Sequence, residues 1–208
     1  MRPQPAPFPA LIGYHEAERC FVNLAGDYDY LGAGYYASQD LEVAGKPVRP
    51  TCQEALDAYV TPVFLHKAQQ LGLSTPEHYT THGEFEPPAI VDSLNPFMSR
   101  QCVVRSPAAQ ERVARSLTRN FKYLICCQTL PPGARVAWFR AVLGGCQPPA
   151  YRALAQQVWA IFHLPLAKVR VVVPADGAPL LSGVWPLPLG ELNAREVARV
   201  RGVVSWPT

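Results

Sequence analysis

Apolar and polar positions along the first fifty residues predict a compact βαβ unit. The apolar run 20–24 (CFVNL) has strand character, and 35–45 (YYASQDLEVAG) predicts a helix that ends at Gly45. The sequence KPVRP that follows begins a second strand. A strand, a glycine turn, a helix and a strand in this order normally form parallel strands with a right-handed crossover.

The next hundred residues are less regular. Thr51 and Glu54 have the spacing of a capping box, which predicts a helix from Cys52, and a second helical segment follows Pro62 to about Leu71. Residues 74–105 are rich in Pro, Thr, Ser and His without a sustained period. We interpret them as a long loop or excursion with one short strand, a feature that is uncommon in compact domains unless it is functional.

Periodicity returns at Ser106, a candidate N-cap, with Pro107 at the first helical position. The four-residue spacing of Val113, Leu117 and Phe121 predicts the buried face of this helix. Two strands, an amphipathic helix and a hairpin around ADGAP follow. A last helix begins near Asn193, again with a glutamate three residues on, at Glu196, which is the spacing of a capping box.

The predicted fold class is α/β. We expect a single domain with a mixed sheet, a Rossmann-like βαβ N-terminal half and a ββαββ C-terminal half. Its expected organisation is a proline-rich lead-in at 1–19 and the domain itself at 20–208, with the excursion at 74–105.

Composition narrows the class of protein. Of 208 residues, 49% are hydrophobic and 17% are charged, which is typical of a globular protein with a core, and 22 prolines predict stiff connections. A net charge of +3 does not by itself indicate nucleic acid or membrane partners, and we expect neither. The six cysteines lack CxxC spacing, and the N-terminus lacks a signal-peptide apolar core, so we expect a cytoplasmic location.

The stretch GAGYYAS, residues 32–38, is the first candidate site. Gly32 and Gly34 allow a tight turn, and the free N–H groups of a helix start can hold an anion. The stretch is neither a full GxGxxG fingerprint nor a P-loop, so a purely structural turn is the alternative. Asn23 and Asp27 follow the first strand, at the sheet edge where α/β proteins bind ligands, although a loop-capping role is equally consistent.

Other clusters of polar residues are weaker candidates for a functional site. His78, His82 and Glu84 lie in a segment with little helical character and do not predict zinc or another metal site. Cys126 and Cys127 are adjacent, so they point to opposite faces of a strand. A solvated face explains the arginines of the helix after Ser106, which are Arg112, Arg115 and Arg119.

The block from Phe21 to Pro50 resembles the N-terminal domain that precedes the catalytic part of RimK-like ATP-grasp ligases. Matching positions are Asn23, Leu24, Tyr28, Tyr30, Gly34, Tyr35, Tyr36, Ser38 and Pro50. The later stretch YRALAQQVWAIFHLPLAKVRVVV and the segment GVWPLPLGEL are similar to the family's helix, strand and tryptophan-containing strand. The chain departs from the family after FKYLI, where CCQTLPPGARVAWFR replaces a tyrosine-phenylalanine-glycine-arginine motif.

The resemblance implies association with carboxylate–amine ligase chemistry. In the family a catalytic region follows, whereas this sequence reaches Thr208 and contains only four lysines and no recognisable magnesium-binding carboxylate cluster. We therefore expect no cofactor in the isolated chain, with ATP and magnesium implied only for a partner ligase. The candidate ligand-binding residues are Asn23, Asp27, Tyr28, Tyr30, Gly32, Gly34, Tyr35, Tyr36 and Ser38.

Two hypotheses follow. In the first, the chain is a non-catalytic module that binds a small amino-acid or peptide ligand or assembles with a separate ATP-grasp ligase subunit. In the second, it is a small enzyme with a cysteine- or histidine-based site at the same sheet edge. The catalytic residues of such an enzyme are not specified by the sequence.

Overall fold

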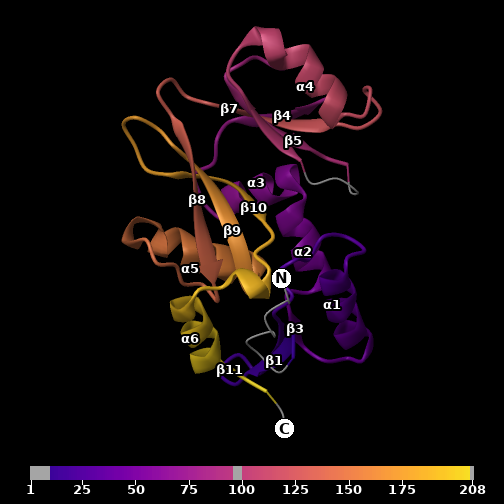
Figure 1. Cartoon of the computed structure of the whole chain (residues 1–208), viewed down its shortest axis with the longest axis vertical. Helices are drawn as coiled ribbons and strands as arrows, with labels where there is room; N and C mark the ends of the chain where they lie inside the picture. Colours follow the sequence, from indigo (N-terminus) through magenta and orange to yellow (C-terminus); the bar gives the residue numbers. More distant parts are fainter. Residues whose placement is uncertain (1–9, 96–99, 207–208) are drawn as a thin grey trace, which may run out of the picture. The chain divides into compact units, whose positions relative to one another are not determined.

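The predicted βαβ unit is present at the start of the chain. In the computed structural model, which describes residues 10–95 and 100–206, it consists of β2 (Cys20–Asn23), α1 (Ala33–Val43) and β3 (Val48–Arg49) (Figure 1). Strands β2 and β3 pair in parallel, with Phe21 opposite Val48. The βαβ prediction is therefore confirmed.

A strand that the sequence analysis missed precedes this unit. Strand β1 (Ile12–His15) pairs antiparallel with β2, and β11 (Val204–Ser205) pairs with β1, giving the sheet order β11-β1-β2-β3. The proline-rich lead-in predicted for 1–19 is thus wrong from residue 12, because a four-residue strand is stabilised by its hairpin partner. Residues 1–9 of that prediction lie outside the described residues.

The described residues form two compact units. Unit 1 comprises residues 10–59, 139–169 and 184–206, and unit 2 comprises residues 60–95, 100–138 and 170–183. Both units contain helices and strands, and the fold class is the mixed α/β class that the sequence predicted.

Unit 1 holds three further helices. The capping box predicted at the last helix is confirmed, because the Asn193 side chain accepts from the Glu196 N–H while the Glu196 carboxylate accepts from the Asn193 N–H. Residues of β2, β9 and α6 build the core of this unit, and Leu24, Leu166 and Val200 are fully buried in it. The helices are α2 (Cys52–Tyr59), α5 (Arg152–Phe162) and α6 (Ala194–Val203).

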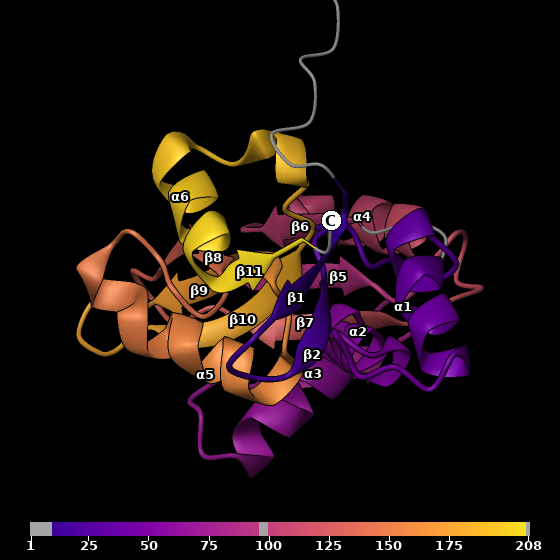
Figure 2. The same ribbon diagram turned by 90° about the horizontal axis from the view of Figure 1, so that it is seen from below.

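A three-stranded sheet has the order β10-β9-β8, and Figure 2 shows these strands from below. The boundaries between the two units fall within all three strands. With β7 before them and α5 between β8 and β9, they form the predicted ββαββ series. The strands are β8 (Arg135–Val142), β9 (Leu166–Val173) and β10 (Leu180–Trp185).

Unit 2 contains an antiparallel sheet with the order β4-β7-β5-β6. Three of its strands lie within 74–105, so the long loop predicted there is wrong. Strand β5 is buried at four consecutive positions. Its sequence therefore lacks the alternation of apolar and polar residues by which a half-buried strand is predicted. The strands are β4 (His78–Thr81), β5 (Ala89–Ser93), β6 (Gln101–Val104) and β7 (Ile125–Thr129).

Two helices, α3 (Thr61–Gln70) and α4 (Gln110–Leu117), complete unit 2. Helix α4 begins after a single 3-10 turn at Pro107–Ala109 and ends earlier than predicted. Residues 119–121 adopt a left-handed backbone with φ of 51°, 57° and 63°. Phe121 is therefore not on the buried face of the helix, as the spacing predicted, but is 44% exposed.

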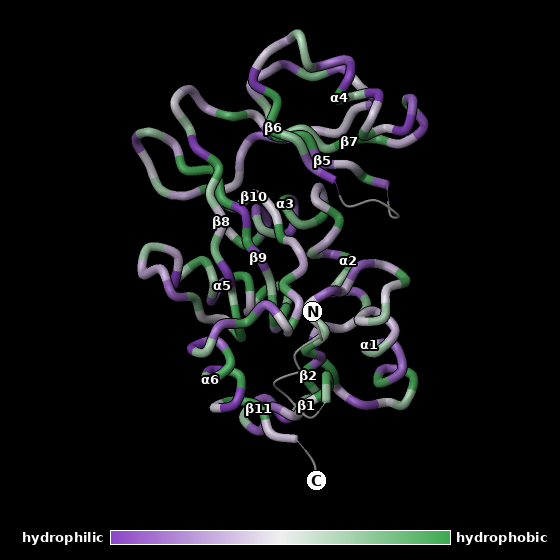
Figure 3. The backbone as a smooth tube through the Cα atoms, viewed as in Figure 1, coloured by the Kyte–Doolittle hydropathy of each residue, from purple (hydrophilic) through white to green (hydrophobic). Residues whose placement is uncertain are grey.

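Figure 3 shows that hydrophobic and hydrophilic residues are interspersed along the chain in both units. Cys127 belongs to the apolar core under α4, and both Cys126 and Cys127 are buried on β7. Within the described ranges, no helix has both the length and the apolar character that crossing a membrane requires.

The core of unit 2 also contains a charged residue. Arg170 of β9 has no exposed surface, and its guanidinium forms two parallel bonds with the Asp92 carboxylate, Nη1 to Oδ1 at 2.8 Å and Nη2 to Oδ2 at 2.7 Å. Its Nε donates to Ser182 Oγ at 2.9 Å, and Nη1 also donates to Gln101. Gln128 closes the network by donating to Asp92 Oδ2 and accepting from Ser182 Oγ.

Candidate functional site

Asn23, the last residue of β2, fastens the strand to α1. Its buried side-chain amide donates to the carbonyl oxygen of Gly34 at 2.7 Å and to Ser38 Oγ at 3.0 Å. Its Oδ1 accepts from the N–H of Ala25 at 3.1 Å. The polar atoms of Asn23 are thus used inside the β2–α1 turn.

Ser38 and Tyr28 extend this internal framework. Ser38 Oγ donates to the carbonyl oxygen of Pro50 at 2.7 Å, which connects α1 to the residue after β3. The Tyr28 hydroxyl donates to the carbonyl oxygen of Asn23 at 2.7 Å, and its ring packs edge-on against Tyr59. Burial raises the pKa of Tyr28 well above its usual value, so the hydroxyl stays a donor.

The two glycines permit close backbone approach. A Cβ at Gly34 would lie 1.9 Å from the carbonyl oxygen of Asp27, and a Cβ at Gly32 would lie 2.9 Å from that of Asp29. Gly32 is the N-cap of α1, and no side chain caps the helix there. Both glycines therefore have a structural role in this turn, because a side chain at either position would meet a backbone carbonyl oxygen.

Gly34→Ala is expected to destabilise the protein by about 2–4 kcal/mol, because the added methyl overlaps a backbone oxygen that cannot rotate away. Gly202→Ala is the matched control, since nothing lies within 4 Å of a Cβ there and α6 gains a better helix former. Urea unfolding of both variants checks this. Equal stability of the two variants would contradict the assigned role of Gly34.

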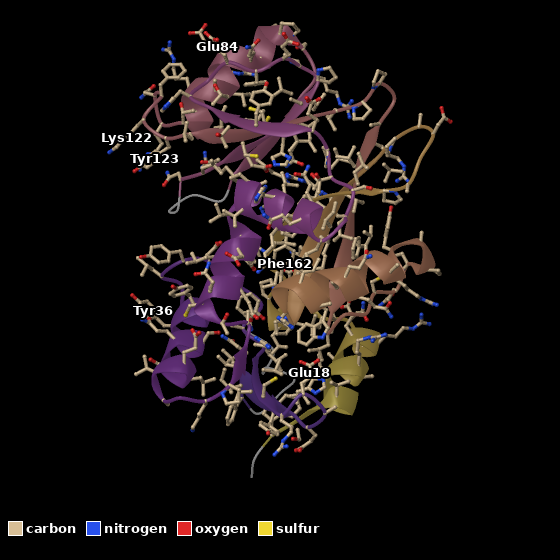
Figure 4. The ribbon with its side chains drawn as sticks, turned by 180° about the vertical axis from the view of Figure 1, so that it is seen from behind. Glu18, Tyr36, Glu84, Lys122, Tyr123 and Phe162 are labelled. Atoms are coloured by element: carbon tan, nitrogen blue, oxygen red, sulfur yellow. The ribbon has the colours of Figure 1, made fainter. Side chains whose placement is uncertain are left out.

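Three side chains of the same segment face outward. Tyr30, Leu31 and Tyr36 are 44%, 45% and 47% exposed, and Figure 4 shows Tyr36 pointing away from α1. Tyr35 lies between the other tyrosines, with its ring centroid 5.4 Å from Tyr30 and 6.3 Å from Tyr36 in edge-on contacts. We call Tyr30, Leu31, Tyr35 and Tyr36 the tyrosine surface.

Asp27 precedes the residues of the tyrosine surface in the sequence and is exposed. Its Oδ1 accepts from the N–H of Asp29 at 3.1 Å, so it caps its own loop. The nine predicted residues therefore fall into two groups with Gly32 at the junction. Asn23, Tyr28, Gly34 and Ser38 form the buried framework, and Asp27, Tyr30, Tyr35 and Tyr36 are the outer residues.

A second polar cluster in unit 1 was not predicted as a site. Glu54 Oε1 accepts from Arg49 Nη1 at 2.6 Å and pairs with His163 Nδ1 at 2.8 Å. Its Oε2 accepts from the N–H of Thr51 at 2.8 Å, and Thr51 Oγ1 accepts from the N–H of Glu54, which confirms the predicted capping box. The capping-box spacing of Thr51 and Glu54 was the only part of this cluster that the sequence signalled. His163 lies 109 residues after Glu54, so nothing in the sequence indicated their contact.

The cluster adjoins a pocket of about 710 Å³ whose lining includes Glu18, Cys20, Lys46 and Arg49. Charges of both signs line it, so it favours no single class of ligand. The described residues contain no group of three or more His, Cys, Asp or Glu side chains placed to hold a metal ion.

The electrostatics of Glu54 predict a pH effect. Burial raises its pKa, but the hydrogen bonds from His163 and Thr51 and the charge of Arg49 outweigh burial and lower it below 4.5. A lowered carboxyl pKa gives stability that is present above the unfolded-state pKa and lost as pH falls through the folded-state pKa.

Glu54→Gln should therefore cost about 1–3 kcal/mol at neutral pH and progressively less below pH ~4.5. Urea unfolding of wild type and variant across this range measures the difference. A difference that stays constant with pH would contradict the assignment, and Glu16→Gln, an exposed position, serves as the control.

Comparisons with known proteins agree with this architecture. The family model for the RimK-like ATP-grasp N-terminal domain matches residues 14–201. No protein with a curated description matches the sequence.

Solved structures with a similar fold are ATP-grasp proteins. The RimK domain protein ATP-grasp from Sphaerobacter thermophilus has 19% identity and a TM-score of 0.57, with 81% of this chain and 71% of that chain covered. D-alanine-D-alanine ligase from Helicobacter pylori has 13% identity and a TM-score of 0.57, covering 86% and 69%. L-amino acid ligase from Bacillus licheniformis has 13% identity and a TM-score of 0.52, covering 73% and 45%.

At these identities the similarity establishes the fold and not the activity. Neither unit alone contains four fifths of the chain, so the first two matches include residues of both units. The resemblance that began with the βαβ segment therefore extends well beyond it.

Proposed function

Because this chain belongs to the family of RimK-like ATP-grasp N-terminal domains, we propose that it acts as a non-catalytic ligand-binding or assembly module for an ATP-grasp ligase carried on a separate chain. The ligase would supply the ATP and magnesium chemistry. The module would need no cofactor of its own, and it would act in the cytoplasm, where its six free cysteines stay reduced.

The tyrosine surface is the observation that carries this proposal. Exposed aromatic rings next to one another are enriched at protein interfaces, where a tyrosine buries a large area and keeps a hydroxyl for hydrogen bonding. The framework of Asn23, Tyr28 and Ser38 holds this segment from inside. Because this segment is already ordered, little conformational entropy is lost when it binds a partner.

A small amino-acid or peptide ligand is the other occupant of this surface. The exposed Asp27 carboxylate, three residues before Tyr30 in the sequence, suits an ammonium group, and the uncapped start of α1 suits a carboxylate. The two occupants are not exclusive, because a ligand bound at an assembly surface can be shared by both chains.

A thermal-shift panel tests the proposal. It contains an ATP-grasp ligase from the same genome, ATP with magnesium, free amino acids and dipeptides. We expect the melting temperature to rise with the ligase, with an amino acid or with a dipeptide, because a ligand that binds the folded state stabilises it. No shift with any of these three would overturn the proposal.

The raised pKa values of two cysteines give little support to the alternative that the protein is an enzyme with a cysteine-based site. Burial raises the pKa of Cys127 to about 12, with a further contribution from the Asp92 charge. Burial and a hydrogen bond with Glu42 raise the pKa of Cys52 to about 11. Both thiols stay protonated at neutral pH, whereas a nucleophile must be a thiolate. These raised pKa values favour the non-catalytic module over an enzyme with a cysteine nucleophile.

A further inference from the structure

We propose that unit 2 carries a separate binding surface, an acidic groove that takes a lysine- or arginine-containing peptide segment of a partner protein. The groove consists of two neighbouring pockets on the α4 side of the β4-β7-β5-β6 sheet. All of its residues belong to unit 2 and none to the tyrosine surface. The proposed groove can therefore be tested independently of the function proposed above.

The two pockets are continuous along strand β4. Their volumes are about 580 and 860 Å³, and Glu84 and Gln110 line both. Alternate residues of a strand point to the same face of the sheet. Tyr79 lines the larger pocket and Thr81, two residues on, lines the smaller, so β4 forms one wall of both.

Carboxylates dominate the lining. Glu77, Glu84, Glu86 and Glu111 line the groove, and of the described lining residues none is a lysine or an arginine. Glu111 accepts from Arg115 of its own helix at 2.9 Å, which leaves the other three as the main source of negative charge. This segregation occurs in a chain whose net charge is +3, so it marks a local surface for a cation.

Aromatic rings stand beside these carboxylates. Tyr79 is 42% exposed, and the left-handed turn after α4 places the exposed Phe121 ring over Gly83, where a Cβ would lie 2.8 Å from Phe121 Cε1. Thr118 Oγ1 accepts from the N–H of Phe121 at 2.7 Å and fixes this turn. Figure 4 shows Glu84 at the outer surface of unit 2. An aromatic face with a carboxylate nearby is the arrangement that binds ammonium and guanidinium groups.

An extended peptide fits better than a single amine. The pockets follow one another along β4, and alternate side chains of an extended chain are spaced by about 7 Å. Strand β4 is also the last strand in its sheet, so its outer side offers backbone groups to an added strand. A peptide with a basic residue at every second position would present them to both pockets.

Fluorescence anisotropy with a labelled (Lys-Ala)₄ peptide tests the proposal. We expect the wild-type chain to bind this peptide in low salt, to lose it as salt rises, and not to bind the matched (Glu-Ala)₄ peptide. Glu84→Gln with Glu86→Gln should weaken binding about fivefold or more, since each exposed ion pair contributes modestly.

Asp40→Asn with Asp176→Asn is the matched control, because it removes two exposed negative charges elsewhere and should leave the affinity unchanged. Tyr79→Ala should weaken binding without any change of charge. Circular dichroism confirms that each variant is folded. No binding by the wild type, or equal binding by the groove variant and the control variant, would overturn the proposal.

Discussion

Arg170→Ala is expected to lower the free energy of unfolding by about 3–5 kcal/mol. The guanidinium is fully buried and makes two bonds to Asp92, so its removal leaves the Asp92 carboxylate buried without its counter-charge. Gln128 still donates to Asp92, but it is neutral and cannot replace the lost charge. The cost is therefore that of an uncompensated buried ion and not that of one hydrogen bond.

Urea unfolding followed by tryptophan fluorescence measures this effect. Arg112→Ala is the control, because Arg112 is exposed on α4 and its removal should change stability by about 0.5 kcal/mol or less. If Arg170→Ala costs no more than the control, the network does not stabilise unit 2. The double variant Arg170→Met with Asp92→Leu should recover part of the loss, because no buried charge then remains.

Alanine at both Tyr30 and Tyr36 is expected to weaken the complex with an ATP-grasp ligase at least about thirtyfold. Truncating an aromatic residue at the centre of an interface commonly costs about 2 kcal/mol or more, and this variant truncates two aromatic residues that both pack against Tyr35. Both side chains are exposed, so the fold itself should tolerate the change.

Titration of the labelled ligase with each variant measures this affinity. Val43→Ala is the control, because Val43 is an 83% exposed apolar residue of the same helix outside the tyrosine surface. An unchanged affinity in the double tyrosine variant would place the ligase contact elsewhere on the chain.

Local patterns explain which parts of the fold could be predicted. The βαβ unit, the capping boxes at Glu54 and Glu196 and the C-terminal ββαββ series depend on residues close in sequence. Strand β1 and the strands within 74–105 are four or five residues long, and their pairing partners stabilise them more than their own periodicity does.

The polar clusters could not be predicted for a related reason. Asp92 and Arg170 are 78 residues apart, so in the sequence Arg170 is only one of two cations, with Lys168, in an otherwise apolar strand. At the β2–α1 turn the sequence grouped nine residues as one candidate site but did not separate buried from exposed side chains. Burial distinguishes Asn23 and Ser38, whose polar atoms bond inside, from Tyr30 and Tyr36, whose rings remain exposed.

Co-purification tests directly whether this protein assembles with an ATP-grasp ligase on a separate chain. The tagged protein is expressed together with an ATP-grasp ligase of the same genome that lacks an N-terminal domain of its own, and the purified material is passed over a size-exclusion column. We predict that the two elute as one complex, and that the Tyr30→Ala, Tyr36→Ala variant elutes apart from the ligase. Separate elution of the wild-type protein and the ligase would contradict it.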